Sequence, residues 1–198
     1  MKKYNLIYAD FPWIQKAGRP LRGYKIENKK QLFIPTSNVS KNLPYKTMTI
    51  EEGTNLDVKE ISEKDAFLFF FFFIKHLFSA KEIIESWGFR YVACITWKKK
   101  KMGGGLGGVV RITSEFLMFC RRGNLKALEN IPESVIEAKR PYVKGFPCHS
   151  KKPEVFRELI ERITPPGNKL EMFARHHTEG WDVYGDEVDN SIKINNSK

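Results

Sequence analysis

Apolar positions along the chain follow two periodicities, one typical of strands and the other typical of helices. Short β-prone apolar runs predict strands over residues 6–8, 67–74, 91–97, 116–120 and 169–174. Apolar side chains at helical spacing predict amphipathic helices over residues 76–87 and 153–163, and Thr49 with Glu52 has the spacing of a helix-opening capping box. Because strand and helix signals alternate, we expect an α/β fold with a mostly parallel central sheet flanked by helices.

The phenylalanine run at residues 69–73 is the most apolar part of the chain. With its apolar neighbours it covers residues 66–74, far fewer than the roughly 20 residues that a membrane-spanning helix needs. It therefore predicts a buried central strand and no membrane partner. With neither a linker nor an internal repeat, we expect a single domain over residues 1–188, followed by a polar, disordered tail over residues 189–198.

The first predicted strand ends abruptly at Asp10-Phe11-Pro12-Trp13. In open α/β sheets, ligands bind at the carboxyl ends of the strands. Because Pro12 has no N–H and restricts Phe11 to extended geometry, the carbonyls of Asp10 and Phe11 are expected to be free to accept hydrogen bonds. Two acceptors beside the Trp13 ring would suit the exocyclic amine of a flat base, although a strand end followed by a turn is the simpler interpretation of such a tetrapeptide.

The charge of the chain favours a polyanionic partner. The formal net charge is +11 and the isoelectric point is about 9.5. Residues 15–46 carry eight basic residues and one acidic residue, a net charge of +7, and Lys16, Arg19 and Arg22 come soon after the tetrapeptide. This segment could hold the phosphates of a nucleic acid, or it could be a solvated loop that confers solubility.

Other signals argue against metal and dinucleotide sites. The three cysteines have no paired spacing, which predicts reduced thiols in a cytoplasmic protein, and His149, His176 and His177 match no common zinc pattern. The glycines of residues 103–108 formally fit a dinucleotide pattern, but four lysines precede them and no helix opening follows. We expect this stretch to be a mobile loop near the substrate path.

Several sequence blocks in one order resemble the MT-A70 family of adenine-N6 methyltransferases, especially its short bacterial and phage members. The blocks span nearly the whole chain: YADFPW (8–13), LPYKTM (43–48), WGFRY (87–91), WK (97–98), residues 115–123, HSKKP (149–153), KLEMFAR (169–175) and GWDVYG (180–185). The resemblance implies a Rossmann-like methyltransferase fold that uses S-adenosyl-L-methionine. It also implies a permuted order, in which the target-amine motif precedes the cofactor strand.

The resemblance also implies roles for individual residues. Asp10, Phe11, Pro12 and Trp13 would form the catalytic turn, in which Asp10 and the Phe11 carbonyl accept the two amine hydrogens and Trp13 stacks on the base. Tyr45 matches a loop tyrosine that contacts the substrate nucleoside. The residues that match cofactor-contacting positions, in addition to Asp10, are Lys152, Glu171, Arg175, His177, Thr178, Asp186 and Glu187.

The chain departs from the family pattern at two places in this set. Phe11 stands where the family has proline, so the turn gains an N–H and loses stiffness. Asp186 and Glu187 replace a pair that is rich in amides in many relatives, so the recognition of the cofactor adenine is expected to differ.

The expected function is S-adenosylmethionine-dependent methylation of adenine N6 in DNA, with the target base flipped out or already single-stranded. DNA is preferred over RNA by analogy with short bacterial and phage relatives that have no appended RNA-binding module. The alternatives are an RNA adenine-N6 methyltransferase, a catalytically silent nucleic-acid-binding subunit, and a methyltransferase for a small amine or a protein. The chain would act in the cytoplasm of a bacterial or phage-infected cell as a monomer, a homodimer or a heterodimer with a related subunit.

Overall fold

The computed structural model describes residues 2–14, 22–27, 30–35, 46–100, 110, 112–131, 133–143, 146–147 and 151–196. Of these, residues 22–27, 30–35, 142–143 and 146–147 are described by their backbone only. The basic segment with Lys16 and Arg19, the loop tyrosine Tyr45, the glycine-rich stretch 103–108 and His149 lie outside the described residues, so the expectations for them stay predictions. Arg22 belongs to a described strand, but its side chain does not belong to the described part.

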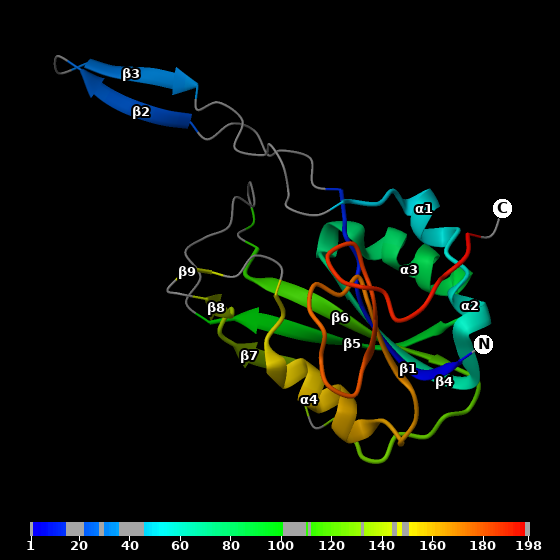
Figure 1. Ribbon diagram of the computed structural model, residues 1–198. Coiled ribbons are helices and arrows are strands. Elements are labelled where there is room, and N and C mark those ends of the chain that lie inside the picture. Colours follow the sequence, from blue (N-terminus) through cyan, green and yellow to red (C-terminus); the bar gives the residue numbers. More distant parts are fainter. Residues whose placement is uncertain are drawn as a thin grey trace.

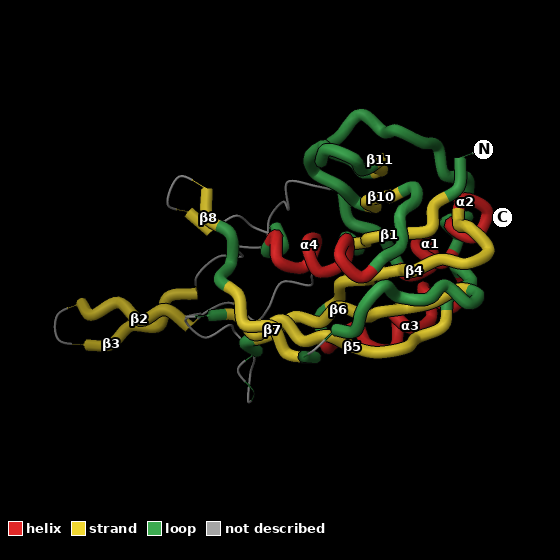
Figure 2. Tube along the Cα trace, turned by 90° about the horizontal axis from the view of Figure 1, so that it is seen from below, coloured by secondary structure: helices red, strands yellow, loops and turns green. Residues whose placement is uncertain are grey.

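A seven-stranded sheet forms the centre of the domain, in the order β11-β10-β1-β4-β6-β5-β7 (Figure 2). Its strands are β1 (Tyr4–Asp10), β4 (Ser62–Phe72), β5 (Arg90–Lys99), β6 (Ser114–Arg122), β7 (Val135–Ala138), β10 (Lys169–Met172) and β11 (Asp182–Tyr184). The helices are α1 (Ile50–Thr54), α2 (Val58–Ile61), the 3-10 helix η1 (Ile74–His76), α3 (Leu77–Ser86) and α4 (Glu154–Ile163). Two antiparallel pairs complete the described elements: β2 (Arg22–Glu27) with β3 (Lys30–Pro35), and β8 (Tyr142–Val143) with β9 (Phe146–Pro147).

Most strand pairs of the sheet are parallel, which confirms the predicted class. β1 is parallel to β4 and β10, β10 is parallel to β11, and β5 is parallel to β7. Only β6 runs against its two neighbours, β4 and β5. The chain continues from β1 to β4 on one side and reaches β10 on the other side only near its end, so the strand order reverses beside β1.

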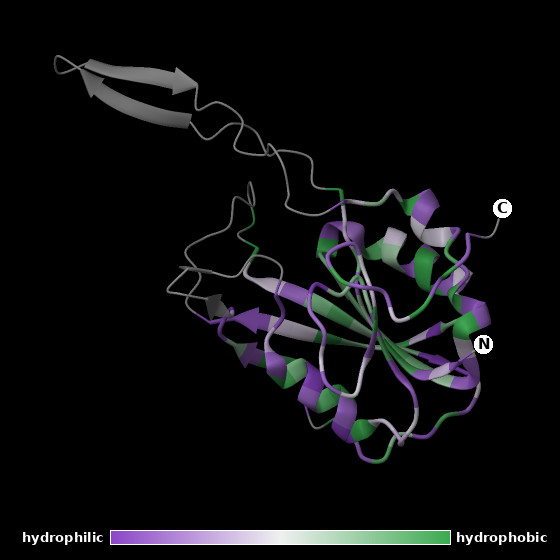
Figure 3. Ribbon diagram, viewed as in Figure 1, coloured by the Kyte–Doolittle hydropathy of each residue, from purple (hydrophilic) through white to green (hydrophobic). Residues whose placement is uncertain are grey.

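Helices cover both faces of the sheet, with α4 on one face and α1, α2 and α3 on the other (Figure 1). The phenylalanine run explains how one strand serves both layers. Phe67, Phe69 and Phe71 pack in the layer of α4, whereas Phe70 and Phe72 pack in the layer of α3. Because successive side chains of a strand point to opposite faces, a strand buried on both sides reads as a continuous apolar run, and Figure 3 shows the apolar residues concentrated in these central strands.

The structure confirms two features of the sequence that predicted helices: the spacing of apolar residues in α4 and the capping box at α1. Apolar positions at helical spacing place Phe156, Leu159, Ile160 and Ile163 of α4 in the core, and Pro153 precedes its first turn. At α1 the capping box is present: the Glu52 N–H donates to the Thr49 hydroxyl at 3.1 Å, and the Thr49 N–H donates to the Glu52 carboxylate at 2.7 Å.

The end of the chain differs from its prediction. Residues 189–196 were expected to form a disordered tail, but they lie across the domain. Ile192 and Ile194 pack against the core, and the Asp57 N–H donates to the Asn195 carbonyl at 2.9 Å. Two apolar residues eight and ten positions beyond the end of β11 are too weak a pattern to reveal this docking, because it depends on the surface that receives them.

Gly123, directly after β6, gives a test of the fold. Its φ is +62°, and a Cβ there would overlap the Asp65 carboxylate and the Lys64 carbonyl. We expect Gly123→Ala to lower the free energy of unfolding by more than about 2 kcal/mol, measured by urea denaturation. Gly180→Ala is the matched control, since its φ is +75° but its nearest neighbour is the flexible end of Lys169 at 3.5 Å, so it should cost only about 1 kcal/mol. Equal losses in the two variants would contradict the close packing at Gly123.

Candidate active site

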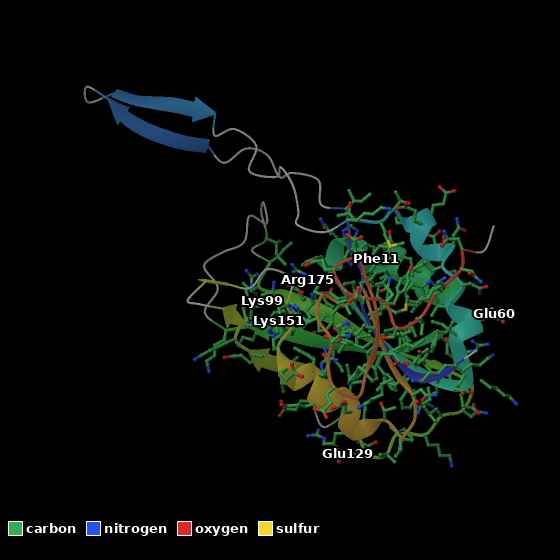
Figure 4. The ribbon with its side chains drawn as sticks, viewed as in Figure 1. Phe11, Glu60, Lys99, Glu129, Lys151 and Arg175 are labelled. Atoms are coloured by element: carbon green, nitrogen blue, oxygen red, sulfur yellow. The ribbon has the colours of Figure 1, made fainter. Side chains whose placement is uncertain are left out.

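A pocket of about 660 Å³ opens at the carboxyl ends of β1 and β10. This is the point where the strand order reverses, the usual position of ligand sites in open α/β sheets. Its lining comes from segments far apart in the sequence: Asp10, Phe11, Pro12, Trp13, Lys46, Met48, Glu52, Leu56, Phe73, Lys99, Glu115, Arg140, Lys152, Phe173, Ala174, Arg175, Tyr184, Gly185, Asp186, Glu187, Asn190 and Asn196. Figure 4 shows Phe11, Lys99 and Arg175 at this end of the domain, whereas Glu60 and Glu129 lie elsewhere on the surface.

Four charged side chains of alternating sign form a row along one wall of the pocket. Asp10 accepts from the Lys152 ammonium at 2.5 Å, and Lys152 lies 3.5 Å from the Glu115 carboxylate. Lys99 completes the row at 2.6 Å from Glu115. The side chains of Lys99, Glu115 and Lys152 are at most 9% exposed, whereas that of Asp10 is 29% exposed. Asp10 is therefore the carboxylate of the row that a ligand can reach. The other three charged groups are buried and form ion pairs with their neighbours in the row.

The shifts in pKa within this row follow from burial and from the neighbouring charges. Burial raises the pKa of the Asp10 carboxyl, although the Lys152 ammonium opposes the rise. Burial acts in the same sense on Glu115, but Lys152 and Lys99 outweigh it and hold the pKa of Glu115 below its usual value. For Lys152, burial disfavours the ammonium, and the attraction of Asp10 and Glu115 outweighs it, so its pKa is raised. The cation between the two carboxylates is thus held in its charged form.

The turn after β1 is fixed by two backbone hydrogen bonds and by an aromatic anchor. The Trp13 N–H donates to the Phe11 carbonyl at 2.9 Å, and the Met48 N–H donates to the Pro12 carbonyl at 3.0 Å. The Phe11 carbonyl, expected to be free, therefore keeps only its second lone pair for a ligand. The Phe11 ring is 2% exposed and packs against Gly53 with no room for a Cβ there, so side-chain packing restrains the turn where the family has a second proline.

The Trp13 ring, which was predicted to stack on the target base, is almost completely buried in this structure. Its indole is 4% exposed and stacks on the His76 imidazole, with ring centroids 4.2 Å apart and planes 7° from parallel. The Phe11 ring lies 4.7 Å away. A base can stack on the face that His76 covers only if the imidazole moves.

The segments that follow β10 and β11 deliver a second group of polar residues to the pocket. Arg175 binds the Glu187 carboxylate through two nitrogens, at 2.8 and 3.1 Å, and Asp186 accepts from the Lys46 N–H at 3.2 Å. Gly185 crosses the Ala174 backbone so closely that a Cβ would overlap the Ala174 carbonyl. The structure therefore brings the predicted cofactor residues Arg175, Asp186 and Glu187 into the same pocket as Asp10 and Lys152.

Three of the predicted cofactor residues do not line this pocket. Glu171 lies in β10, and its carboxylate is paired with Arg157 of α4 at 2.7 Å. His177 and Thr178 are in the segment that leads from β10 to β11 and are absent from the pocket lining. Their proposed contacts with a cofactor are not supported by this geometry.

Other residues of the pocket were missed at the sequence level. Lys99 and Glu115 lie on adjacent strands, and Lys99 follows Ile95 and Trp97 on an alternation of buried positions that pointed inward. Arg140, Asn190 and Asn196 carried no such signal. Polar residues at inward positions near a strand end are the feature that could have identified the lysine and the glutamate.

Among the described residues, no group of three or more His, Cys, Asp or Glu side chains is suited to hold a metal ion. Nor does any helix within the described ranges have the length and apolar character needed to span a bilayer.

Several known proteins are similar to this chain over most of its length. A type II methyltransferase, M.MunI, from a Mycoplasma species is 30% identical over 98% of this chain and 82% of the relative. An MT-A70-like N(6)-adenosine-methyltransferase of Arabidopsis thaliana is 29% identical over 82% of this chain but 24% of its own length. The human N(6)-adenosine-methyltransferase catalytic subunit METTL3 is 25% identical over 78% of this chain and 27% of its length. Since the MT-A70 family model also matches residues 4–187, the chain belongs to the MT-A70 family.

Proposed function

We propose that the protein transfers a methyl group from S-adenosyl-L-methionine to the exocyclic N6 amine of adenine in DNA. The observation that carries the proposal is the Asp10 carboxylate, which a buried lysine holds at the carboxyl end of β1 on the wall of a pocket of about 660 Å³. Pockets of this size suit a nucleoside-sized ligand. The similarity to a type II methyltransferase over 82% of that relative supports DNA as the substrate.

The chemistry of the pocket lining fits the proposed cofactor. Its amino-acid end carries a carboxylate and an ammonium group, for which Arg140 and Asp10 offer opposite charges. Its ribose hydroxyls can donate to carboxylates such as Glu187, and Phe173 and Leu56 offer apolar contacts to its base. When bound, the cofactor supplies an electrophilic methyl group on a sulfonium.

Asp10 would act on the target amine. Its carboxylate accepts a hydrogen bond from the amine and, with the remaining lone pair of the Phe11 carbonyl, aims the nitrogen lone pair at the methyl carbon. Formation of the N–C bond at the expense of the S–C bond would leave one proton too many on the amine, and the Asp10 carboxylate would accept that proton or pass it to solvent. Lys152 keeps Asp10 in place, because its ammonium binds the Asp10 carboxylate and is itself held by the Glu115 carboxylate.

RNA is the second candidate substrate, because several relatives of this chain are named as adenosine methyltransferases. One of them, from Pyricularia oryzae, is an N6-methyladenosine RNA methyltransferase that is 27% identical over 93% of this chain and 47% of its own length. Adenine is common to the two nucleic acids, so DNA and RNA present the same amine to the pocket.

The direct test uses the purified full chain with labelled S-adenosylmethionine and adenine-containing DNA or RNA in single- and double-stranded form. The products are digested to nucleosides and N6-methyladenine is quantified by mass spectrometry. Methylation of DNA above RNA supports the proposal, and the reverse result assigns the RNA activity. Cofactor binding without methylation of either nucleic acid would identify a catalytically silent subunit.

The raised pKa of Asp10 predicts the pH dependence of the reaction. The carboxylate must be ionised to accept from the amine, so kcat should fall as the pH is lowered through a pKa above the ordinary value of 3.8. Initial rates at saturating cofactor and DNA across the acidic range measure this, with circular dichroism as the control for folding. A constant rate down to the ordinary aspartate pKa, in a protein that stays folded, would contradict the assignment.

A further inference from the structure

The segment 189–196 is attached at two places on either side of the pocket. After β11, Ser191 lies beside Val183: its N–H donates to the Val183 carbonyl at 2.8 Å, and its hydroxyl accepts from the Val183 N–H at 3.0 Å. Further on, Asn195 accepts from the Asp57 N–H between α1 and α2. In Figure 1 the last described residues accordingly lie beside these two helices. The segment thus joins the edge of the sheet to the helical layer.

Two asparagines of this segment line the pocket, although the family match ends at residue 187. The Asn190 Oδ1 accepts from the Gly185 N–H at 2.6 Å, which leaves the Asn190 amide nitrogen as a donor. Asn196 forms a β-bridge with Leu56, and these two residues lie together in the pocket wall.

Hydrogen-bond donors are needed at this end of the pocket beside the carboxylates of Asp186 and Glu187. In the described lining the phenol of Tyr184 is one neutral donor, and the amides of Asn190 and Asn196 add two more. Asp186 and Glu187 carry carboxylates, which when ionised only accept hydrogen bonds, and Glu187 is engaged by Arg175. An adenine ring presents one donating amine and several ring nitrogens that accept. Carboxylates can satisfy the amine and the ribose hydroxyls, but ring nitrogens need donors such as the amides of Asn190 and Asn196.

We infer that residues 189–196 form the nucleoside wall of the cofactor pocket, and that Asn190 and Asn196 donate hydrogen bonds to ring nitrogens of the cofactor's adenine. This inference rests on the proposed function, because it assumes that the pocket holds S-adenosylmethionine. It assigns to two amides beyond the family match the donor role that Asp186 and Glu187 cannot perform.

The test measures binding of S-adenosylhomocysteine, the product form of the cofactor, to the full chain by calorimetry. Asn190→Asp keeps the acceptor for the Gly185 N–H and removes the donor, and Asn196→Asp removes the second donor. Each should weaken binding about three- to tenfold, the usual effect of losing one hydrogen bond. Asn195→Asp is the matched control, since it adds the same charge in the same segment, but Asn195 does not line this pocket. It should bind as the wild type does.

Analogues of S-adenosylhomocysteine in which one ring nitrogen is replaced by C–H distinguish a direct contact from a structural effect. The wild type should lose affinity for the analogue that lacks a contacted nitrogen, whereas the aspartate variant at the contacting position should lose no more than it has already lost. Wild-type affinity in the two pocket variants, or the same loss for Asn195→Asp, would overturn the inference while leaving the proposed function intact. No binding of S-adenosylhomocysteine by the wild type would overturn both.

Discussion

Replacement of Asp10 by alanine or asparagine is expected to lower the rate of methyl transfer by about 10²- to 10⁴-fold. The carboxylate is the most exposed charge of the buried row and the group at the end of β1 that can accept from the target amine. Asparagine preserves the shape of the side chain but removes its charge, so it separates the electrostatic contribution from packing. We expect cofactor affinity to fall by less than about tenfold, because the variant loses the one contact of Asp10 with the cofactor's ammonium group while the rest of the pocket lining is untouched.

The measurement is single-turnover methylation of DNA with cofactor and DNA above their dissociation constants. Glu60→Gln is a suitable control, since it removes one carboxylate from α2 at a surface position far from this pocket (Figure 4). A variant with Asp10 replaced that methylates at the wild-type rate would exclude this residue from the reaction. Loss of cofactor binding equal to the loss of rate would assign it to binding instead.

Replacement of Lys152 by methionine is expected to reduce the free energy of unfolding by about 3 kcal/mol at neutral pH. Lys152 lies between Asp10 and Glu115, and methionine leaves two largely buried carboxylates with Lys99 as the remaining cation of the row. Removing one partner of a buried ion pair is costly because the other charge stays buried without compensation. Lys151→Met is the control, since Lys151 is exposed and such surface changes usually stay within about 0.5 kcal/mol.

The pH dependence of the Lys152 variant has a definite sign. In the wild type the pKa of Glu115 is held low, so its contribution to stability is present at neutral pH and is lost as the pH falls through that pKa. Without the lysine, the folded-state pKa values of Asp10 and Glu115 rise. Protonation of these carboxyl groups then removes uncompensated buried charge and stabilises the folded state. The difference in unfolding free energy between variant and wild type should therefore shrink from neutral to mildly acidic pH, as measured by urea denaturation. A difference that grows, or no destabilisation beyond that of Lys151→Met, would contradict the buried row of charges.

Much of the fold could be predicted because its signals are local. The phenylalanine run is long enough and apolar enough to specify a strand buried on two faces, and β4 has this environment. The spacing of Phe156, Leu159, Ile160 and Ile163 specifies the buried face of α4 in the same way. The short strands β7 and β11 were not predicted, because three or four residues carry no clear period.

The site was predictable to a lesser extent. The end of β1 located Asp10, since a strand that stops at an acidic turn places a carboxylate at the edge of the sheet. The resemblance to a family supplied Lys152, Arg175, Asp186 and Glu187, and the pocket contains all four. It also suggested Glu171, but in this chain that carboxylate is paired with Arg157 and does not line the pocket.

The sequence by itself determined the α/β class, the carboxylate at the end of the first strand, and membership of the family, since each is written in short contiguous stretches. Only the tertiary structure decided that Lys99 and Glu115 stand behind Asp10, that His76 covers Trp13, and that the polar end of the chain lines the pocket. These contacts join residues tens of positions apart. They depend on which strands and segments lie beside one another. Local periodicity can place a side chain on one face of a strand, as it does for Lys99, but it carries no information about that pairing.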